Sequence, residues 1–136
     1  MPAMLFLFST KKLLMVNILI VDDSEEVREN LSRLISTIDG LNIIGKAENH
    51  SDAVMLFEKH KPYIVILDID LGLENGIEIL KHIKHLYPAT IVIMLTNYSN
   101  SGFKLSTEKL GADYFLDKSL DLERLINILM NIARQK

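Results

Sequence analysis

The chain has 136 residues, 49% of them hydrophobic, and a formal net charge of −3. This length fits one domain with one core, and the acidic balance argues against direct nucleic-acid binding by this chain. The absence of cysteine excludes a disulfide framework, a thiolate metal site and a cysteine nucleophile. It also fits a reducing, cytoplasmic setting.

The first 14 residues, MPAMLFLFSTKKLL, differ from the rest of the chain. Their apolar run, Met4–Phe8, is far shorter than the roughly 20 residues that span a bilayer, so no membrane span is expected. Lys11 and Lys12 follow this run, whereas a signal peptide places its charge first. We interpret residues 1–14 as an extension ahead of a domain at 15–136, either disordered or the product of an over-long start before Met15. A strand-like addition or a membrane-touching tail is less favoured.

Five short apolar runs alternate with segments of helical periodicity. Because the runs are continuous, they are typical of parallel strands that are covered on both faces. Strict alternation favours right-handed crossovers, and five units predict an open doubly wound α/β sheet rather than an eight-unit barrel. The runs are Asn17–Val21, Ile43–Ala47, Tyr63–Leu67, Ile91–Leu95 and Tyr114–Leu116.

A helix is predicted after each run. Ser24 is the expected N-cap of the first helix, which Asp39-Gly40 stops, and Ser51 is the expected cap of the second. Pro88 closes the third helix, and the fourth, Ser99–Leu110, is the weakest. The apolar stripes are Val27, Leu31, Leu34, Ile35 and Ile38; Ala53, Leu56 and Phe57; Ile77, Leu80 and Ile83; and Leu122, Leu125, Ile126, Leu129 and Ala133.

Polar side chains collect where the runs end, at the edge of the sheet where open α/β folds hold ligands. Any one of these residues alone is more often simply a polar residue that ends a strand. As a set, however, they combine carboxylates, a hydroxyl and an amine, whose chemistry is complementary. They are Asp22 and Asp23, Asp68 and Asp70, Thr96 and Asn97, and Asp117 and Lys118, with Glu48 and Asn49 expected at the periphery.

The carboxylates of Asp22, Asp23 and Asp68 are expected to crowd together. Two unit charges 4 Å apart repel by about 1 kcal/mol in water and about 4 kcal/mol at an effective dielectric of 20, so the cluster favours a bound cation. Because all the ligands are oxygens, Mg²⁺ or Mn²⁺ is expected rather than zinc. With Lys118 and Thr96 beside them, the set fits phosphoryl transfer, in which a carboxylate is able to act as the nucleophile.

Four segments resemble the successive motifs of a bacterial two-component response-regulator receiver domain: ILIVDDSEEVRENL, VILDIDLGLENGIEIL, IVIMLTNYS and GADYFLDKS. The resemblance covers about residues 16–134 and rests on the order and separation of the motifs. It implies a flavodoxin-like sheet with strand order 2-1-3-4-5 and five helices on both faces. It also implies a signalling receiver rather than an enzyme, and the final helix at the end of the chain suggests a stand-alone one.

The resemblance assigns a role to each acid. Asp68 accepts a phosphoryl group from a histidine kinase or a histidine phosphotransfer protein. Asp22 and Asp23 hold Mg²⁺ together with Asp68, with Asp23 as the direct ligand and Asp22 acting through water. Asp70 provides its backbone carbonyl to the metal, so its side chain need not bind.

The resemblance also implies a switch. Thr96 hydrogen-bonds the phosphoryl oxygen, Lys118 pairs with it, and Phe115 occupies the rotameric switch position. The surface near the fourth helix, fifth strand and fifth helix then changes, which affects an unknown downstream protein or the formation of a homodimer. Passing the phosphoryl group onward, as a phosphorelay intermediate, is an equally physical alternative.

The sequence departs from the family pattern at several positions. Ser119 replaces a usual Pro, which leaves open whether the peptide bond before it is cis, and Gly72 stands where Pro is frequent. Asn97 is larger than the usual residue and narrows access to the acceptor. Asn97 and the added negative charge of Asp70 are expected to alter the rate of autodephosphorylation, but the sequence does not predict whether the rate rises or falls. Gly76 matches the turn glycine of the family.

ILDIDLG also resembles the nucleophile motif of haloacid-dehalogenase-like phosphatases, in which Asp68 attacks phosphate and Asp70 is the general acid. That motif normally opens its fold, and it leaves Asp22-Asp23 unexplained. A pseudo-receiver that binds partners without phosphorylation is a third alternative, which the complete acceptor set disfavours.

Other side chains carry smaller expectations. Tyr114 and Phe115 are neighbours on a strand and point to opposite faces, so one of them is expected in the core. His82 and His85 have a spacing that is able to chelate metal, but a solvated pair is expected. Tyr98 either covers the site or faces solvent.

Overall fold

The computed structural model describes residues 15–97 and 101–135. The extension at residues 1–14, Tyr98 and the first two residues of the predicted fourth helix lie outside the described residues. Within the described part, no helix has the length and apolar character needed to cross a membrane.

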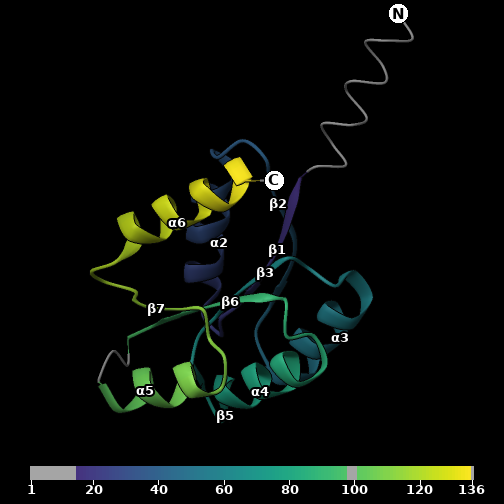
Figure 1. Cartoon of the computed structure of the whole chain (residues 1–136), viewed down its shortest axis with the longest axis vertical. Helices are drawn as coiled ribbons and strands as arrows, with labels where there is room; N and C mark the ends of the chain where they lie inside the picture. Colours follow the sequence, from purple (N-terminus) through teal and green to yellow (C-terminus); the bar gives the residue numbers. More distant parts are fainter. Residues whose placement is uncertain (1–14, 98–100, 136) are drawn as a thin grey trace, which may run out of the picture.

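Five parallel strands form one sheet in the order β2-β1-β3-β6-β7 (Figure 1). The labels β4 and β5 belong to a separate small hairpin, so β6 and β7 are the fourth and fifth strands of the main sheet. The order is therefore the predicted 2-1-3-4-5. The strands are β1 (Val16–Val21), β2 (Leu41–Ala47), β3 (Ile64–Leu67), β6 (Ile91–Thr96) and β7 (Tyr114–Asp117). The predicted fold class is therefore confirmed, although β2 begins two residues earlier than expected.

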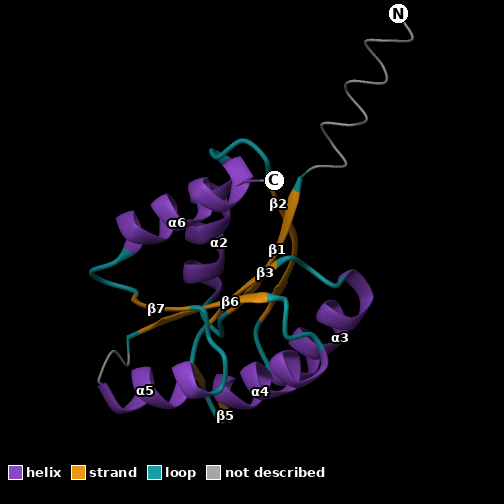
Figure 2. Ribbon diagram, in the orientation of Figure 1, coloured by secondary structure: helices purple, strands orange, loops and turns teal. Residues whose placement is uncertain are grey.

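Helices cover both faces of this sheet (Figure 2). One face carries α2 (Glu25–Ser36) and α6 (Leu122–Gln135), and the other carries α3 (His50–His60), α4 (Gly76–Leu86) and α5 (Ser101–Lys109). Neighbouring strand residues enter opposite cores: Ile18 and Ile20 pack in the α2–α6 core, whereas Leu19 packs in the other. All three are completely buried, which explains why the strand sequences are apolar without alternation.

The helix ends agree only partly with the predictions. Ser24 caps α2, since its hydroxyl oxygen accepts a hydrogen bond from the Val27 N–H at 3.2 Å. The cap of α3 is Asn49, whose side chain accepts from the Asp52 N–H at 2.8 Å. The expectation for Ser51 was wrong, because this residue already lies inside the helix.

A two-stranded antiparallel hairpin, β4 (Asp70–Leu71) and β5 (Glu74–Asn75), follows β3 and was not predicted. Gly72 lies in its turn with φ +76°. A proline, whose ring holds φ near −65°, is unable to adopt this conformation. Glycine adopts this φ without strain, so it suits the turn of the hairpin where the proline frequent in the family does not.

Three expectations about individual residues are resolved. Tyr114 and Phe115 do pack on opposite faces of the sheet, but both are half-buried. The expectation of a solvated histidine pair is wrong for His82, because its buried Nε2 lies 3.6 Å from Oε1 of Glu58. No peptide bond among the described residues is cis, so the bond before Ser119 is trans.

Candidate phosphoacceptor site

Strand register brings the candidate site together. Val21 pairs with Leu67, and Leu67 pairs with Met94, so the residues that follow β1 and β3 emerge side by side next to the end of β6. Thr96 pairs in turn with Asp117, which places Lys118 just beyond the end of β7. The four strands thus deliver their polar residues to one edge of the sheet, as the sequence predicted.

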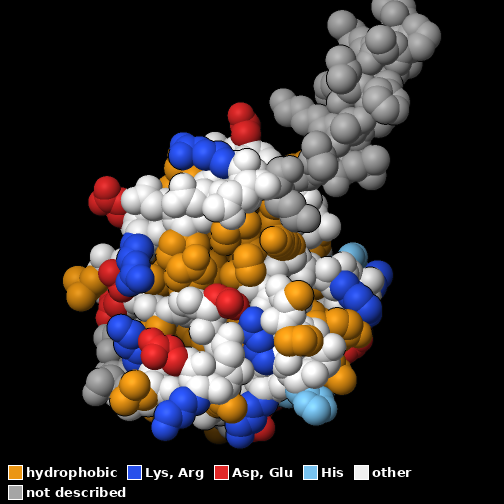
Figure 3. All heavy atoms as spheres, in the orientation of Figure 1, with side chains coloured by type: hydrophobic (Ala, Val, Ile, Leu, Met, Phe, Trp, Pro, Cys, Tyr) orange, Lys and Arg blue, Asp and Glu red, His pale blue; other side chains and the backbone are white. Residues whose placement is uncertain are grey.

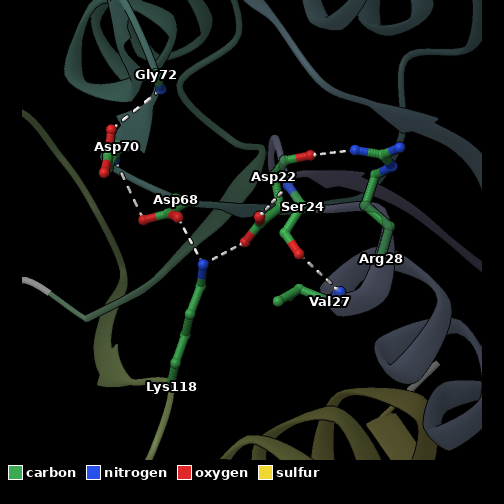
Figure 4. Close-up of polar contacts among 8 residues, drawn as sticks. All are labelled: Asp22, Ser24, Val27, Arg28, Asp68, Asp70, Gly72 and Lys118. Atoms are coloured by element: carbon green, nitrogen blue, oxygen red, sulfur yellow. Dashed lines mark hydrogen bonds and ion pairs between the residues drawn. The ribbon is translucent and has the colours of Figure 1, made fainter.

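Lys118 joins two of the acids directly (Figure 4). Its ammonium nitrogen lies 2.5 Å from Oδ2 of Asp22 and 2.6 Å from Oδ2 of Asp68. Asp22 and Asp68 are 2% and 4% exposed, so these are ion pairs in a largely water-excluded setting. Such short, charge-assisted contacts hold both carboxylates in fixed positions.

Asp22 and Asp68 are also held by backbone donors. Oδ1 of Asp22 accepts from the Ser24 N–H at 2.9 Å, and Oδ1 of Asp68 accepts from the Asp70 N–H at 3.2 Å. The Arg28 guanidinium donates to the backbone carbonyl of Asp22 at 2.7 Å. The start of α2 is thereby tied to the end of β1.

The carboxylates of Asp22, Asp23 and Asp68 form a group able to hold a metal ion, with one oxygen from each within 4.8 Å of the others. Asp23 is exposed while the other two are buried, so the group opens toward solvent on one side. An all-oxygen set that opens to water suits Mg²⁺, which keeps several waters, better than zinc. The donor chemistry therefore fits the predicted ion.

Burial and the contact with Lys118 shift the pKa of Asp22 in opposite directions. Burial raises the pKa of Asp22 above its ordinary value of 3.8, although the hydrogen bond from Lys118 works against this shift. For Lys118, burial alone lowers the pKa, but the bonds to Asp22 and Asp68 outweigh it and raise the pKa above 10.5. Lys118 is therefore a fixed positive charge at neutral pH.

Asp70 behaves differently from the other acids. Its Oδ1 accepts from the Gly72 N–H at 3.0 Å, and Figure 4 shows its side chain directed toward Gly72 rather than toward Lys118. Its carboxylate is not part of the metal-binding group identified among the described residues. The Asp70 carboxylate is thus tied to the turn of the β4–β5 hairpin, whereas those of Asp22 and Asp68 are tied to Lys118.

Gly76 lies against the backbone of the acceptor. Its N–H donates to the Ile69 carbonyl at 2.7 Å, and a Cβ added to it would lie only 1.9 Å from the carbonyl oxygen of Asp68. Contacts of that length do not occur, so only glycine allows α4 to begin this close to β3. The predicted turn glycine thus has a steric reason.

A pocket of about 250 Å³ opens at this edge. Asn97, which directly follows β6, is one of the residues that line it. Thr96, the last residue of β6, is completely buried, and Phe115 packs partly buried against the core on the α3–α4–α5 face of the sheet. The complete lining is Asp23, Ser24, Val27, Asp68, Asp70, Asn97 and Lys118.

Two supporting residues were missed in the sequence. Arg28 was assigned no role, although its position four residues after the N-cap places it one helical turn from the site. Asp117 was noted only as a polar strand end. Its Oδ1 accepts from the N–H groups of Ser119 and Leu120 at 2.7 and 3.1 Å, which shapes the turn that follows Lys118.

Comparisons with known proteins agree with this geometry. The family model for the response regulator receiver domain matches residues 18–130. The transcriptional regulatory protein YdfI of Bacillus subtilis is 37% identical over 115 residues, which are 85% of this chain and 54% of that protein. This chain therefore spans about half the length of the curated relatives it matches.

Solved structures are also similar. A LuxR-family two-component response regulator from Aurantimonas sp. SI85-9A1 superposes with a TM-score of 0.81 at 30% identity, covering 90% of this chain and 87% of that one. A CheX–CheY–BeF₃–Mg²⁺ complex from Borrelia burgdorferi gives 0.79 at 29% identity, covering 86% and 88%. Sequence, fold and site together show that the chain belongs to the response regulator receiver domain family.

Proposed function

We propose that this receiver takes a phosphoryl group onto Asp68 from a phosphohistidine of a kinase or phosphotransfer protein in the cytoplasm. The observation that supports this most directly is the position of Asp68, which lines an open pocket while Lys118 contacts its carboxylate at 2.6 Å. A carboxylate that faces a pocket and is already paired with a cation suits nucleophilic attack on phosphorus.

In the proposed step, a carboxylate oxygen of Asp68 forms a bond to phosphorus as the phosphorus–nitrogen bond of the donor breaks. The imidazole nitrogen leaves with the bonding electron pair, and an acyl phosphate remains on the receiver. The product carries a new charge of about −2. Lys118, held at the pocket by Asp22 and Asp68, supplies a positive charge that offsets it.

Asp22, Asp23 and Asp68 would hold Mg²⁺ or Mn²⁺, with the backbone carbonyl of Asp70 as a further ligand, and the ion would offset charge on the transferring oxygens. The fit of three clustered carboxylates supports this assignment. The similar solved structure from Borrelia burgdorferi is a CheX–CheY complex with both BeF₃ and Mg²⁺. That complex is a precedent for the same chemistry here.

The signal would pass from Thr96 to Phe115 and then to the surface of α5, β7 and α6. The pairing of Met94 with Phe115 and the burial of Thr96 couple these strands tightly. Figure 3 shows apolar side chains gathered below α6, and Leu105, Leu120 and Leu122 are exposed on these elements or the adjoining loop. An apolar surface of this kind suits a downstream protein or a homodimer.

The test compares wild type, Asp68→Asn and Asp70→Asn after incubation with Mg²⁺ and a small acyl phosphate or a kinase, with phosphate uptake followed by mass. Asp70→Asn is a matched control because the asparagine oxygen is still able to accept from Gly72. Uptake should be lost in Asp68→Asn alone. Equal uptake by Asp68→Asn would overturn the assignment, and steady turnover of phosphoesters that is lost in Asp70→Asn would favour a phosphatase.

Onward transfer is tested with the same phosphorylated protein. Phosphate that moves from Asp68 to an added histidine phosphotransfer protein would support a phosphorelay role. Phosphate that leaves only as inorganic phosphate would support a terminal receiver.

A further inference from the structure

A groove of about 480 Å³ lies between the C-terminal ends of α2 and α6. Its apolar lining is Ile38 from the turn after α2 and Ile126, Met130 and Ala133 from α6, all of them half-buried. Asp39 and Arg134 add one charge of each sign, and both are exposed. The phosphoacceptor site uses none of these residues.

The chain enters the domain beside this groove. The Val16 N–H donates to the carbonyl oxygen of Gly40 at 2.8 Å, directly after Asp39. Gly40 in turn lies against α6, because a Cβ added to it would meet Cβ of Ala133 at 3.6 Å. Figure 1 likewise shows the beginning of β1 close to the end of α6. The described part of the chain therefore begins next to the groove.

We propose that the apolar run Met4–Phe8 of the same chain occupies this groove. Its five consecutive large apolar side chains are too few to span a bilayer, yet leaving them in water is unfavourable. The groove offers them apolar side chains from two sides. In the sequence, Lys11 and Lys12 come between the run and β1, so with the run in the groove their positive charges would be available to pair with Asp39.

The connecting length is sufficient. Phe8 precedes Val16 by eight residues, which span up to about 26 Å when extended. The groove side of α6, from Ile126 to Ala133, is about 10 Å long at 1.5 Å per residue. The run is thus able to reach the whole groove without disturbing β1.

Docking there leaves the phosphoacceptor site free. The run enters at the amino ends of the strands, where Val16 begins β1, whereas Asp68 lies at their carboxyl ends. The segment would shield the α2–α6 surface from other proteins without blocking Asp68. Phosphate uptake is therefore a suitable check that each test variant is folded.

Because the chain has no cysteine, paired cysteines give an unambiguous test. In full-length Phe6→Cys/Met130→Cys, mild oxidation should form an intramolecular disulfide at least tenfold faster than in Phe6→Cys/Met55→Cys. Met55 is exposed on α3, on the other face of the sheet. Equal rates would overturn the proposal, as would disulfides found only between chains, which would place the run on a second copy.

A second test needs no cysteine. Met130→Glu puts a charge in the groove and should speed trypsin cleavage after Lys11 and Lys12 at least fivefold, whereas Met55→Glu should leave the rate unchanged. Equal cleavage of wild type and Met130→Glu would overturn the proposal. A vesicle test gives a further contrary outcome. If the wild-type chain sediments with phosphatidylcholine–phosphatidylglycerol vesicles and a chain starting at Met15 does not, the run binds a membrane surface and the proposal is overturned.

Discussion

The ammonium nitrogen of Lys118 lies 2.6 Å from Oδ2 of Asp68, across 50 positions of sequence. The Lys118 side chain is 14% exposed, so water screens this contact weakly. The positive charge of Lys118 therefore already neutralises part of the negative charge that would attract a metal ion to Asp22 and Asp68.

Replacing Lys118 with methionine should strengthen Mg²⁺ binding. The change keeps most of the side-chain volume but removes a positive charge beside Asp22 and Asp68. We expect about a tenfold gain in affinity by calorimetric titration, or about 1.4 kcal/mol. Lys46→Met, which removes an exposed lysine paired with Glu29 on α2, is the control and should change nothing. Weaker binding by Lys118→Met would contradict the competition.

Asp22→Asn should stabilise the metal-free protein at neutral pH. Burial raises the folded-state pKa of Asp22 above its unfolded value near 3.8. Ionising this carboxyl is therefore less favourable in the folded protein than in the unfolded chain. The ionised carboxylate consequently lowers stability at pH 7, and asparagine removes that cost. Urea unfolding in chelator should show the gain at pH 7, and the gain should shrink as pH falls through the raised pKa. A gain that grows toward acid pH would contradict the sign.

Gly76→Ala should destabilise the fold by about 2–4 kcal/mol. The new Cβ would lie 1.9 Å from a backbone oxygen of Asp68, which is unable to move without shifting β3 or α4. Gly45→Ala is the control, because its Cβ would meet side-chain atoms of Leu56 and Leu19, the nearest at 3.2 Å, and these are able to rotate. Denaturant midpoints compare the two, and equal midpoints would count against a steric role for Gly76.

Thr96→Val should separate phosphorylation from signalling. Valine fills nearly the same buried volume but lacks the hydroxyl proposed to bond the phosphoryl oxygen. We expect phosphate uptake close to that of wild type, because Asp68 and Lys118 are unchanged, whereas the change in the Phe115 ring resonances on adding beryllofluoride should be mostly lost. Thr90→Val alters a buried threonine just before the other end of β6 and should keep the full change. A full response in Thr96→Val would remove Thr96 from the switch.

Much of the fold follows from local sequence. The completely buried strands, such as Ile64–Leu67, give continuous apolar runs that a doubly covered parallel sheet explains. The β4–β5 hairpin escaped prediction because two-residue strands leave no periodicity. Asn49 and Ser51 are both good N-caps, and only the backbone reveals that the helix begins before Ser51.

The site was predictable for a different reason. Parallel strands in register carry their following residues to one edge, so Asp22, Asp68 and Lys118 were expected to meet. The bridge that Lys118 makes between both carboxylates was not predictable, because it depends on how a long side chain folds over the edge. The contact of Arg28 with the Asp22 carbonyl was unpredictable for the same reason, because it too depends on the conformation of a long side chain.

The pocket at Asp68 is lined by three carboxylates, those of Asp23, Asp68 and Asp70, and by a single lysine among the described residues, and every phosphodonor is itself an anion. A donor that approaches the bare crevice meets repulsion at short range, where salt screens it poorly. Turnover should therefore follow a compulsory order, with the divalent cation bound before the donor. At a low concentration of divalent cation, raising the donor concentration would then not restore the rate of phosphorylation. In a receiver with random-order binding, a high donor concentration would restore this rate.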